Sequence, residues 1–149
     1  MTTYNPLQAK SGVLFPCHGI SIQFNVEEIN GEYIVNLSQN QRSADYFLGL
    51  PFNIASYALL LELVCHYLNG ENEGVNKKYI PGRVILFLGD YHIYDSHYNQ
   101  CIRQIQRYPM KFPQIKLNPN KLKLEDFELE DFNIINYNSY PGIVAEMVA

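Results

Sequence analysis

One long apolar segment constrains the fold of this chain more than any other feature. Residues 54–68, IASYALLLELVCHYL, contain good helix formers and neither glycine nor proline. Asn69 and Gly70 follow as a stop signal, so we predict a helix that begins at residue 53 or 54 and ends at Leu68. Because the segment is apolar on nearly every face, we expect the helix to be buried, with Cys65 in the core.

Alternating and apolar runs around this helix predict strands. Residues 20–26 and 33–37 flank Asn30-Gly31, a pattern typical of an antiparallel hairpin. Residues 83–88 are apolar at consecutive positions and predict a buried strand. Shorter strand patterns follow at residues 114–117 and 132–137. The sequence therefore predicts an α+β fold, in which a mixed or antiparallel sheet packs with a long buried helix.

The length, composition and net charge exclude several classes of protein. The 149 residues fit one domain, and 47% hydrophobic with 13% aromatic residues favour a packed globular protein over a disordered one. The net charge of -4 argues against a surface made for nucleic acid or for anionic membranes. Any recognition of phosphate must therefore come from a few local cations.

The cysteines and the start of the chain point to the cytoplasm. Cys17, Cys65 and Cys101 form neither a closed disulfide framework nor a metal-binding spacing, so we expect no metal site. The first residues lack the basic start and apolar region of a secretory signal. We expect that no apolar run reaches the length of a membrane span, and that the protein is cytoplasmic with reduced thiols.

Residues 41–57, QRSADYFLGLPFNIASY, combine several groups suited to a nucleotide site. Arg42 offers a planar fork for phosphate, and Ser43 can donate a further hydrogen bond to the same oxyanion. The amide of Asn53 matches a donor–acceptor edge such as that of uracil. Gly49 and Pro51 bracket a bend that would place Asp45 and Asn53 on two sides of one pocket. The alternative interpretation is a solvated turn before a helix.

Two further segments contain residues that could bind a ligand or act in catalysis. His92 and Tyr94 lie two residues apart, so in an extended segment they face the same way, either to bind a ligand or to pin a loop. Cys17 is either a small buried hydrophobe or a nucleophile. Nucleophilic chemistry needs the thiolate, and Arg42 is the candidate for lowering the pKa of Cys17.

These segments together resemble the thymidylate synthase family. Residues 41–57 are similar to its nucleotide-binding signature, and residues 88–94, LGDYHIY, to its GD-x-H-x-Y segment. Residues 15–18, FPCH, resemble its catalytic P-C-H, and residues 131–143 resemble its terminus. The four motifs occur in the family's order and cover nearly all of the chain.

The resemblance implies reductive methylation of dUMP to dTMP with 5,10-methylenetetrahydrofolate as co-substrate. In this family a cysteine adds to C6 of dUMP, which makes C5 a carbon nucleophile for the methylene group. Carried onto this sequence, Cys17 is the catalytic nucleophile. The dUMP-binding residues would be Arg42 and Ser43 at the phosphate, Ala44, Asp45 and Asn53 at the base, and His92, Ile93 and Tyr94 at the sugar. The folate-binding residues would be Asp45, Gly49 and Val148.

The resemblance also implies that residues 1–149 are the C-terminal portion of the family's usual single domain. The N-terminal portion supplies further phosphate arginines and a glutamate for proton transfer, for which this sequence offers no replacement. Three interpretations follow: a synthase that is inactive alone, a dUMP hydroxymethylase, or a non-catalytic remnant that serves as an assembly subunit. As partners we expect a second copy in a sheet-on-sheet homodimer or a separate N-terminal half, with no membrane and no nucleic acid required.

Overall fold

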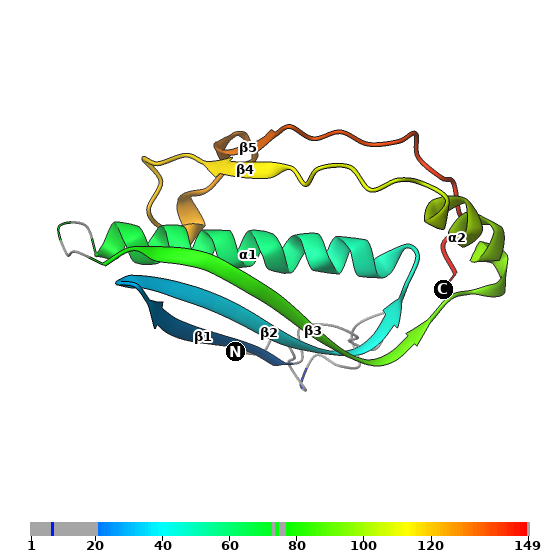
Figure 1. Cartoon of the computed structure of the whole chain (residues 1–149), viewed down its shortest axis with the longest axis horizontal. Coiled ribbons are helices and arrows are strands. Elements are labelled where there is room, and N and C mark those ends of the chain that lie inside the picture. Colours follow the sequence, from blue (N-terminus) through cyan, green and yellow to red (C-terminus); the bar gives the residue numbers. More distant parts are fainter. Residues whose placement is uncertain (1–6, 8–20, 73, 75–76, 149) are drawn as a thin grey trace.

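The structure is a computed structural model that describes residues 7, 21–72, 74 and 77–148. Strands and helices follow one another as a mixed α+β fold, which confirms the predicted class (Figure 1). A sheet of order β1-β2-β3 packs against the long helix α1, and a second sheet pairs β4 with β5. The elements are β1 Ser21–Ile29, β2 Glu32–Asp45, α1 Gly49–Glu71, β3 Tyr79–His92, the 3-10 turn η2 Asp95–His97, α2 Tyr98–Ile105, β4 Gln114–Leu117, the 3-10 turns η3 Leu124–Asp126 and η4 Leu129–Asp131, and β5 Phe132–Ile135.

The predicted hairpin forms β1 and β2. Asn30 and Gly31 both adopt positive φ angles, 54° and 82°, as a two-residue hairpin turn requires. Ile29 pairs with Glu32 across the turn, and the antiparallel register continues to Ser21 opposite Asn40. β2 then runs on to Asp45, so residues 41–45 belong to a strand and not to a solvated turn.

β2 and β3 pair in parallel, and α1 makes the crossover between them. The register shifts between Val35 and Leu37, where β3 carries one extra residue. The side chain of Asn36 fills the resulting gap, since its Oδ1 accepts the Arg83 backbone N–H over 2.8 Å. The shift therefore leaves this donor of β3 satisfied.

Helix α1 is buried on one face, which corrects the prediction of burial all round. Its buried residues, Leu50, Tyr57, Leu61 and Cys65, recur at helical spacing. The last three of them pack with Ile22, Val35 and Leu37 of the sheet. Phe52 on the other side is 75% exposed. The sheet covers one side of the helix, and the β4–β5 sheet lies over only part of the remainder (Figure 1).

The helix is also longer than predicted. It begins at Gly49 and ends at Glu71, so Pro51 lies in its first turn, where a missing N–H costs no intrahelical bond. By length and composition, its 23 residues could cross a bilayer, which corrects the expectation that no run reaches that length. In this structure, its buried face packs on the sheet instead.

Cys65 is confirmed as a core residue, 3% exposed. Burial, followed by the nearby Glu62 carboxylate, raises the pKa of the Cys65 thiol to about 11. The thiolate is the nucleophilic form, so Cys65 stays an unreactive thiol at neutral pH.

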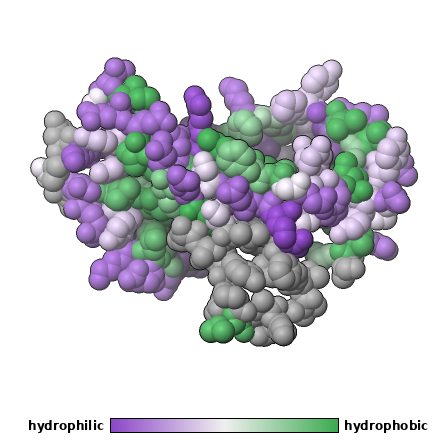
Figure 2. All heavy atoms as spheres, turned by 90° about the horizontal axis from the view of Figure 1, so that it is seen from below, coloured by the Kyte–Doolittle hydropathy of each residue, from purple (hydrophilic) through white to green (hydrophobic). Residues whose placement is uncertain are grey.

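Strand β3 is half-buried, where the sequence predicted a buried strand. Val84 and Leu86 pack on the core side, whereas Ile85 and Phe87 are 39% and 57% exposed. The difference arises because α1 covers one face of the sheet and leaves alternate residues on the other. Figure 2 shows hydrophobic residues reaching the surface among hydrophilic ones on the side of the molecule formed by the sheet.

Of the later strands, β4 has the predicted bounds and β5 is shorter than predicted. β4 and β5 pair antiparallel, and β5 ends at Ile135, before Asn136 adopts a φ of 58°. A 3-10 turn precedes α2, and its N-terminal residue, His97, makes no side-chain capping bond.

We expect Leu61→Ala to lower the free energy of unfolding by about 2–5 kcal/mol, because Leu61 is 2% exposed and its truncation leaves a cavity between α1 and the sheet. Urea denaturation followed by circular dichroism measures this. Leu129→Ala is the matched control, since Leu129 is 83% exposed and should change stability by no more than about 0.5 kcal/mol. Equal losses for both variants would contradict this packing.

Candidate functional site

The ends of β2 and β3 bring together two sequence segments that carry predicted site residues. Parallel pairing sets Ser43 opposite Asp90 and Asp45 opposite His92. Gly89 lies beside Arg42, and a Cβ at residue 89 would stand 2.8 Å from the Arg42 carbonyl oxygen. Glycine is therefore needed for the two strands to approach this closely.

Asp90 connects the two strands through its side chain. Its Oδ2 accepts a hydrogen bond from Ser43 Oγ over 3.3 Å and lies 3.0 Å from His92 Nδ1. A carboxylate oxygen only accepts, so Nδ1 carries a proton and donates, and Nε2 is the nitrogen turned to other partners. Asp90 was not predicted from the sequence as a site residue. The signal was its place two residues before His92 on one strand, which puts both side chains on the same face.

His92 and Tyr94 lie together, as their spacing predicted. Their ring centroids are 5.0 Å apart and the rings meet edge to face. Ile93 between them is 48% exposed and faces an apolar cavity instead. The two polar side chains thus form one potential contact for a sugar, while Ile93 belongs to a different surface.

The side chains of Arg42 and Ser43 lie on opposite faces of the sheet. Successive side chains of a strand alternate between the faces of the sheet. Ser43 shares the α1 side with Asp90, whereas Arg42 is exposed. A phosphate bound by both residues would have to lie where the long Arg42 side chain reaches around the end of the strand, and this joint contact stays a prediction.

Asn53 is oriented by a glutamine that the sequence analysis missed. Gln41 is 3% exposed, and its Nε2 donates to Asn53 Oδ1 over 3.1 Å and to the Ser43 carbonyl oxygen over 3.0 Å. The bond to Asn53 ties the first turns of α1 to the end of β2, and the bond to Ser43 lies within β2. The carboxamide expected to face the base is therefore held by a buried partner.

Asp45 organises the turn between β2 and α1. Its Oδ1 accepts the backbone N–H groups of Phe47 over 3.0 Å and Leu48 over 3.2 Å. A Cβ added at Gly49 would meet Asp45 Cβ at 3.5 Å, an ordinary contact, so the fold itself does not require glycine there. The bend expected at residues 49–51 is instead the first turn of the helix.

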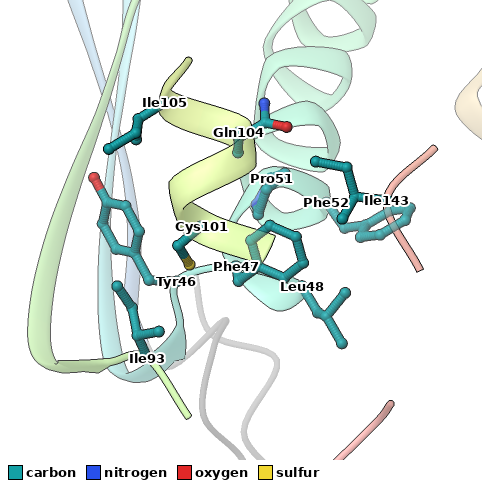
Figure 3. Close-up of a pocket in the computed structure, with 10 residues that line it drawn as sticks. All are labelled: Tyr46, Phe47, Leu48, Pro51, Phe52, Ile93, Cys101, Gln104, Ile105 and Ile143. Carbon is teal, nitrogen blue, oxygen red and sulfur yellow. The ribbon is translucent and has the colours of Figure 1, made fainter. Parts of the chain in front are cut away.

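An apolar cavity of about 450 Å³ opens beside this turn (Figure 3). Its walls come from the turn, the first turn of α1, the end of β3, helix α2 and the segment after β5. Neither Asp45 nor Asn53 lines it, so the expected placement of both on two sides of one pocket does not describe this cavity. Lining residues that the sequence analysis missed are Tyr46, Phe47, Leu48, Phe52, Cys101, Gln104, Ile105 and Ile143.

The remaining predicted residues are placed less fully. Cys17 lies outside the described residues. Ala44 is 2% exposed at the end of β2, and Val148 is 40% exposed on the segment that also carries Ile143. Within the part of the chain that the structure describes, no three histidine, cysteine, aspartate or glutamate side chains gather as a metal site.

Comparison with known protein families agrees with this placement of motifs. The family model described as Thymidylate synthase matches residues 1–149, which is the whole chain. The match includes both segments that β2 and β3 bring together. On the extent of this match, the chain belongs to the thymidylate synthase family.

Proposed function

We propose that this chain carries the dUMP site of a thymidylate synthase and converts dUMP to dTMP through a covalent adduct with Cys17. The observation that carries the proposal is the parallel register at the ends of β2 and β3. It places Ser43, a phosphate candidate, opposite Asp90, which orients the sugar candidate His92. Groups from separate motifs thus meet at one edge of the sheet, where a nucleotide would need them.

We assign a part of dUMP to each group. Arg42 and Ser43 would bind the phosphate, while His92 Nε2 and the Tyr94 hydroxyl would bind the 3′-hydroxyl of the deoxyribose. Asn53 would read the uracil edge with its amide, held in place by Gln41. A site that hydrogen-bonds a base edge in this way rejects bases that present the opposite pattern.

The folate co-substrate is proposed to lie along the turn between β2 and α1. Asp45 and Gly49 begin and end this turn, and the apolar cavity beside it has a volume in the usual range for small-molecule sites. Apolar lining from Leu48, Phe52 and Ile143 suits the flat rings of a folate. When bound, 5,10-methylenetetrahydrofolate supplies the one-carbon unit and the hydride.

The chemistry of the protein begins with the Cys17 thiolate. Its sulfur forms a bond to C6 of dUMP, and the electron pair of the C5–C6 double bond moves to C5, which then forms the bond to the methylene carbon. Loss of the C5 proton would break the bond between the methylene carbon and the folate nitrogen and leave a methylene group doubly bonded to C5. Hydride addition to that methylene carbon would make the methyl group, and the electron pair it displaces would restore the C5–C6 double bond as the Cys17 sulfur leaves C6. A nucleophile of the protein thus divides a difficult carbon alkylation into easier steps.

A homodimer is proposed to cover the exposed side of the sheet. Ile85, Phe87 and Tyr91 alternate along β3 on the face away from α1, and they are 39%, 57% and 67% exposed. Such a stripe is typical of a face that packs against another sheet. The same exposure supports packing against a separately supplied N-terminal half.

Cys17→Ser is expected to abolish the covalent adduct with 5-fluoro-dUMP, because the fluorine at C5 blocks the later proton loss and traps the sulfur–C6 bond. Intact-mass spectrometry with 5,10-methylenetetrahydrofolate measures this, for the chain alone and together with a thymidylate synthase N-terminal half. Cys65→Ala is the matched control and should keep the adduct, because Cys65 lies in the core between α1 and the sheet and does not line the cavity. An adduct that persists in Cys17→Ser would contradict the nucleophile, and none with either preparation of the unmodified chain would contradict the proposed function.

Asn53→Asp is expected to change base preference from dUMP toward dCMP, because a carboxylate only accepts hydrogen bonds and suits the amino group of cytosine. Gln41 Nε2 can still donate to the new carboxylate, so the fold should be retained. We expect the ratio of the two dissociation constants, measured by calorimetry, to change by roughly 10-fold or more. Asn133→Asp, an equal charge change at an exposed position of β5, should leave the ratio as it was. An unchanged ratio in Asn53→Asp would show that Asn53 does not recognise the base.

Asp90→Ala is expected to weaken recognition of the 3′-hydroxyl, because His92 loses the acceptor that orients its ring. The measurement compares the affinities of dUMP and of its analogue without the 3′-hydroxyl, so any effect of the lost charge on the phosphate cancels. The preference for dUMP should fall by roughly fivefold, as for one lost hydrogen bond. Asp95→Ala alters an exposed carboxylate nearby and is the control. A preference that survives Asp90→Ala would show that His92 is oriented by other groups.

A further inference from the structure

His97 is a buried histidine to which neither the sequence analysis nor the proposed mechanism gives a role. It is 0% exposed, ends η2 and directly precedes α2. Its Nε2 lies 2.7 Å from the carbonyl oxygen of Glu146. A carbonyl only accepts, so Nε2 carries a proton and donates this bond. Nδ1 has no hydrogen-bond partner among the described residues, so the Glu146 contact is the polar bond that fixes this ring.

The His97 ring also contacts two parts of the candidate site. Its centroid lies 5.6 Å from that of Phe47, which lines the apolar cavity, and 5.7 Å from that of Tyr94, which meets it edge to face. One buried imidazole therefore touches the cavity wall, the proposed sugar-binding tyrosine and the segment after β5. These three parts of the chain are far apart in sequence and are joined here.

Other contacts hold the same segment along α2, but they lie at the surface. Arg107 donates to the Pro141 carbonyl oxygen over 2.8 Å and stacks on Tyr140 at 5.3 Å, and Gln100 reaches the Val144 carbonyl oxygen at 3.5 Å. Exposed bonds compete with water and contribute less than a bond made in a buried setting. His97 is thus the buried anchor of residues 140–148, which we call the tail segment.

We propose that His97 is a positioning residue that docks the tail segment against the cavity. Ile143 of the tail segment lines the cavity, and Val148 follows the anchored Glu146 by two residues. Without the His97–Glu146 bond, the tail segment would keep only its surface contacts, and the wall made by Ile143 would become mobile. That this wall serves folate binding rests on the proposed function, whereas the docking itself rests on the contacts of His97.

The first test uses the unaltered chain and needs no ligand. Long-range ¹H–¹⁵N correlation of the histidine rings reports which nitrogen carries the proton. We expect the Nε2–H form for His97, with a proton that exchanges slowly because the ring is buried. The Nδ1–H form would overturn the proposal, since Nε2 could not then donate to Glu146.

Two variants of His97 distinguish the contribution of its ring from that of its hydrogen bond. His97→Phe keeps an aromatic ring beside Phe47 and Tyr94 but cannot donate, while His97→Gln keeps a donor near the position of Nε2. His66→Phe is a matched control, because His66 Nε2 also bonds a backbone carbonyl, that of Lys121 at 2.6 Å, and its ring meets Phe127 edge to face at 5.6 Å. His66 holds η3 and its flanks onto α1, away from the cavity, so His66→Phe removes the same kind of bond elsewhere.

Backbone ¹⁵N relaxation of residues 143–147 gives the decisive readout. We expect order parameters to fall from about 0.85 to below about 0.6 in His97→Phe, to recover in His97→Gln, and to stay high in His66→Phe. Unchanged order parameters in His97→Phe would overturn the proposal. If His97→Phe does not fold, the ring protonation in the unaltered chain and the relaxation of His97→Gln still decide the docking.

A second readout separates positioning from stability. In the complex with dUMP, we expect the dissociation constant of tetrahydrofolate, which lacks the methylene group and cannot react, to rise roughly fivefold to tenfold in His97→Phe, as for one lost hydrogen bond. The dissociation constant of dUMP alone should change less than about twofold. Equal weakening of both ligands would indicate a merely structural role and overturn the positioning role. If the unaltered chain binds no folate, the proposed function fails, and the relaxation data still decide the docking of the tail segment.

Discussion

The parallel pairing of β2 with β3 is the constraint on which the rest of the structure depends. Parallel strands need a long crossover, and α1 supplies it while burying one face of the sheet. Their carboxyl ends then lie at the same edge, which is where ligand groups gather in such sheets. Asp45 thereby comes opposite His92, although the two residues are far apart in the chain.

Two asparagines keep this pairing in register. Asn69 near the end of α1 forms a pair of bonds with the backbone of Tyr79, donating to its carbonyl oxygen over 2.9 Å and accepting its N–H over 2.8 Å. Asn36 accepts the Arg83 N–H at the register shift. Side-chain amides therefore fix both the point at which β3 begins after the crossover and the register of β3 against β2. A slip of one residue would turn His92 to the opposite face of the sheet.

Polar side chains with partners from other elements hold the proposed site together. Gln41 joins β2 to α1, Asp90 joins β3 to β2, and His97 joins α2 to the tail segment. Each of them lies next to a residue expected to contact substrate or folate and supports it rather than replacing it. Such supporting contacts keep a site in one geometry, because each fixes a rotamer that would otherwise be free.

The sequence alone determined the hairpin at Asn30-Gly31, the existence of the long helix and the family's motifs, because turn chemistry, helix propensity and local spacing are properties of neighbouring residues. Only the tertiary structure decided that α1 and β3 are each buried on one face, since periodicity cannot show how many layers cover an element. The supporting roles proposed for Asp90 and His97 likewise could not be predicted from the sequence. Each depends on a bond to a distant segment, Ser43 in one case and Glu146 in the other, and pairing between distant segments is set by the fold as a whole.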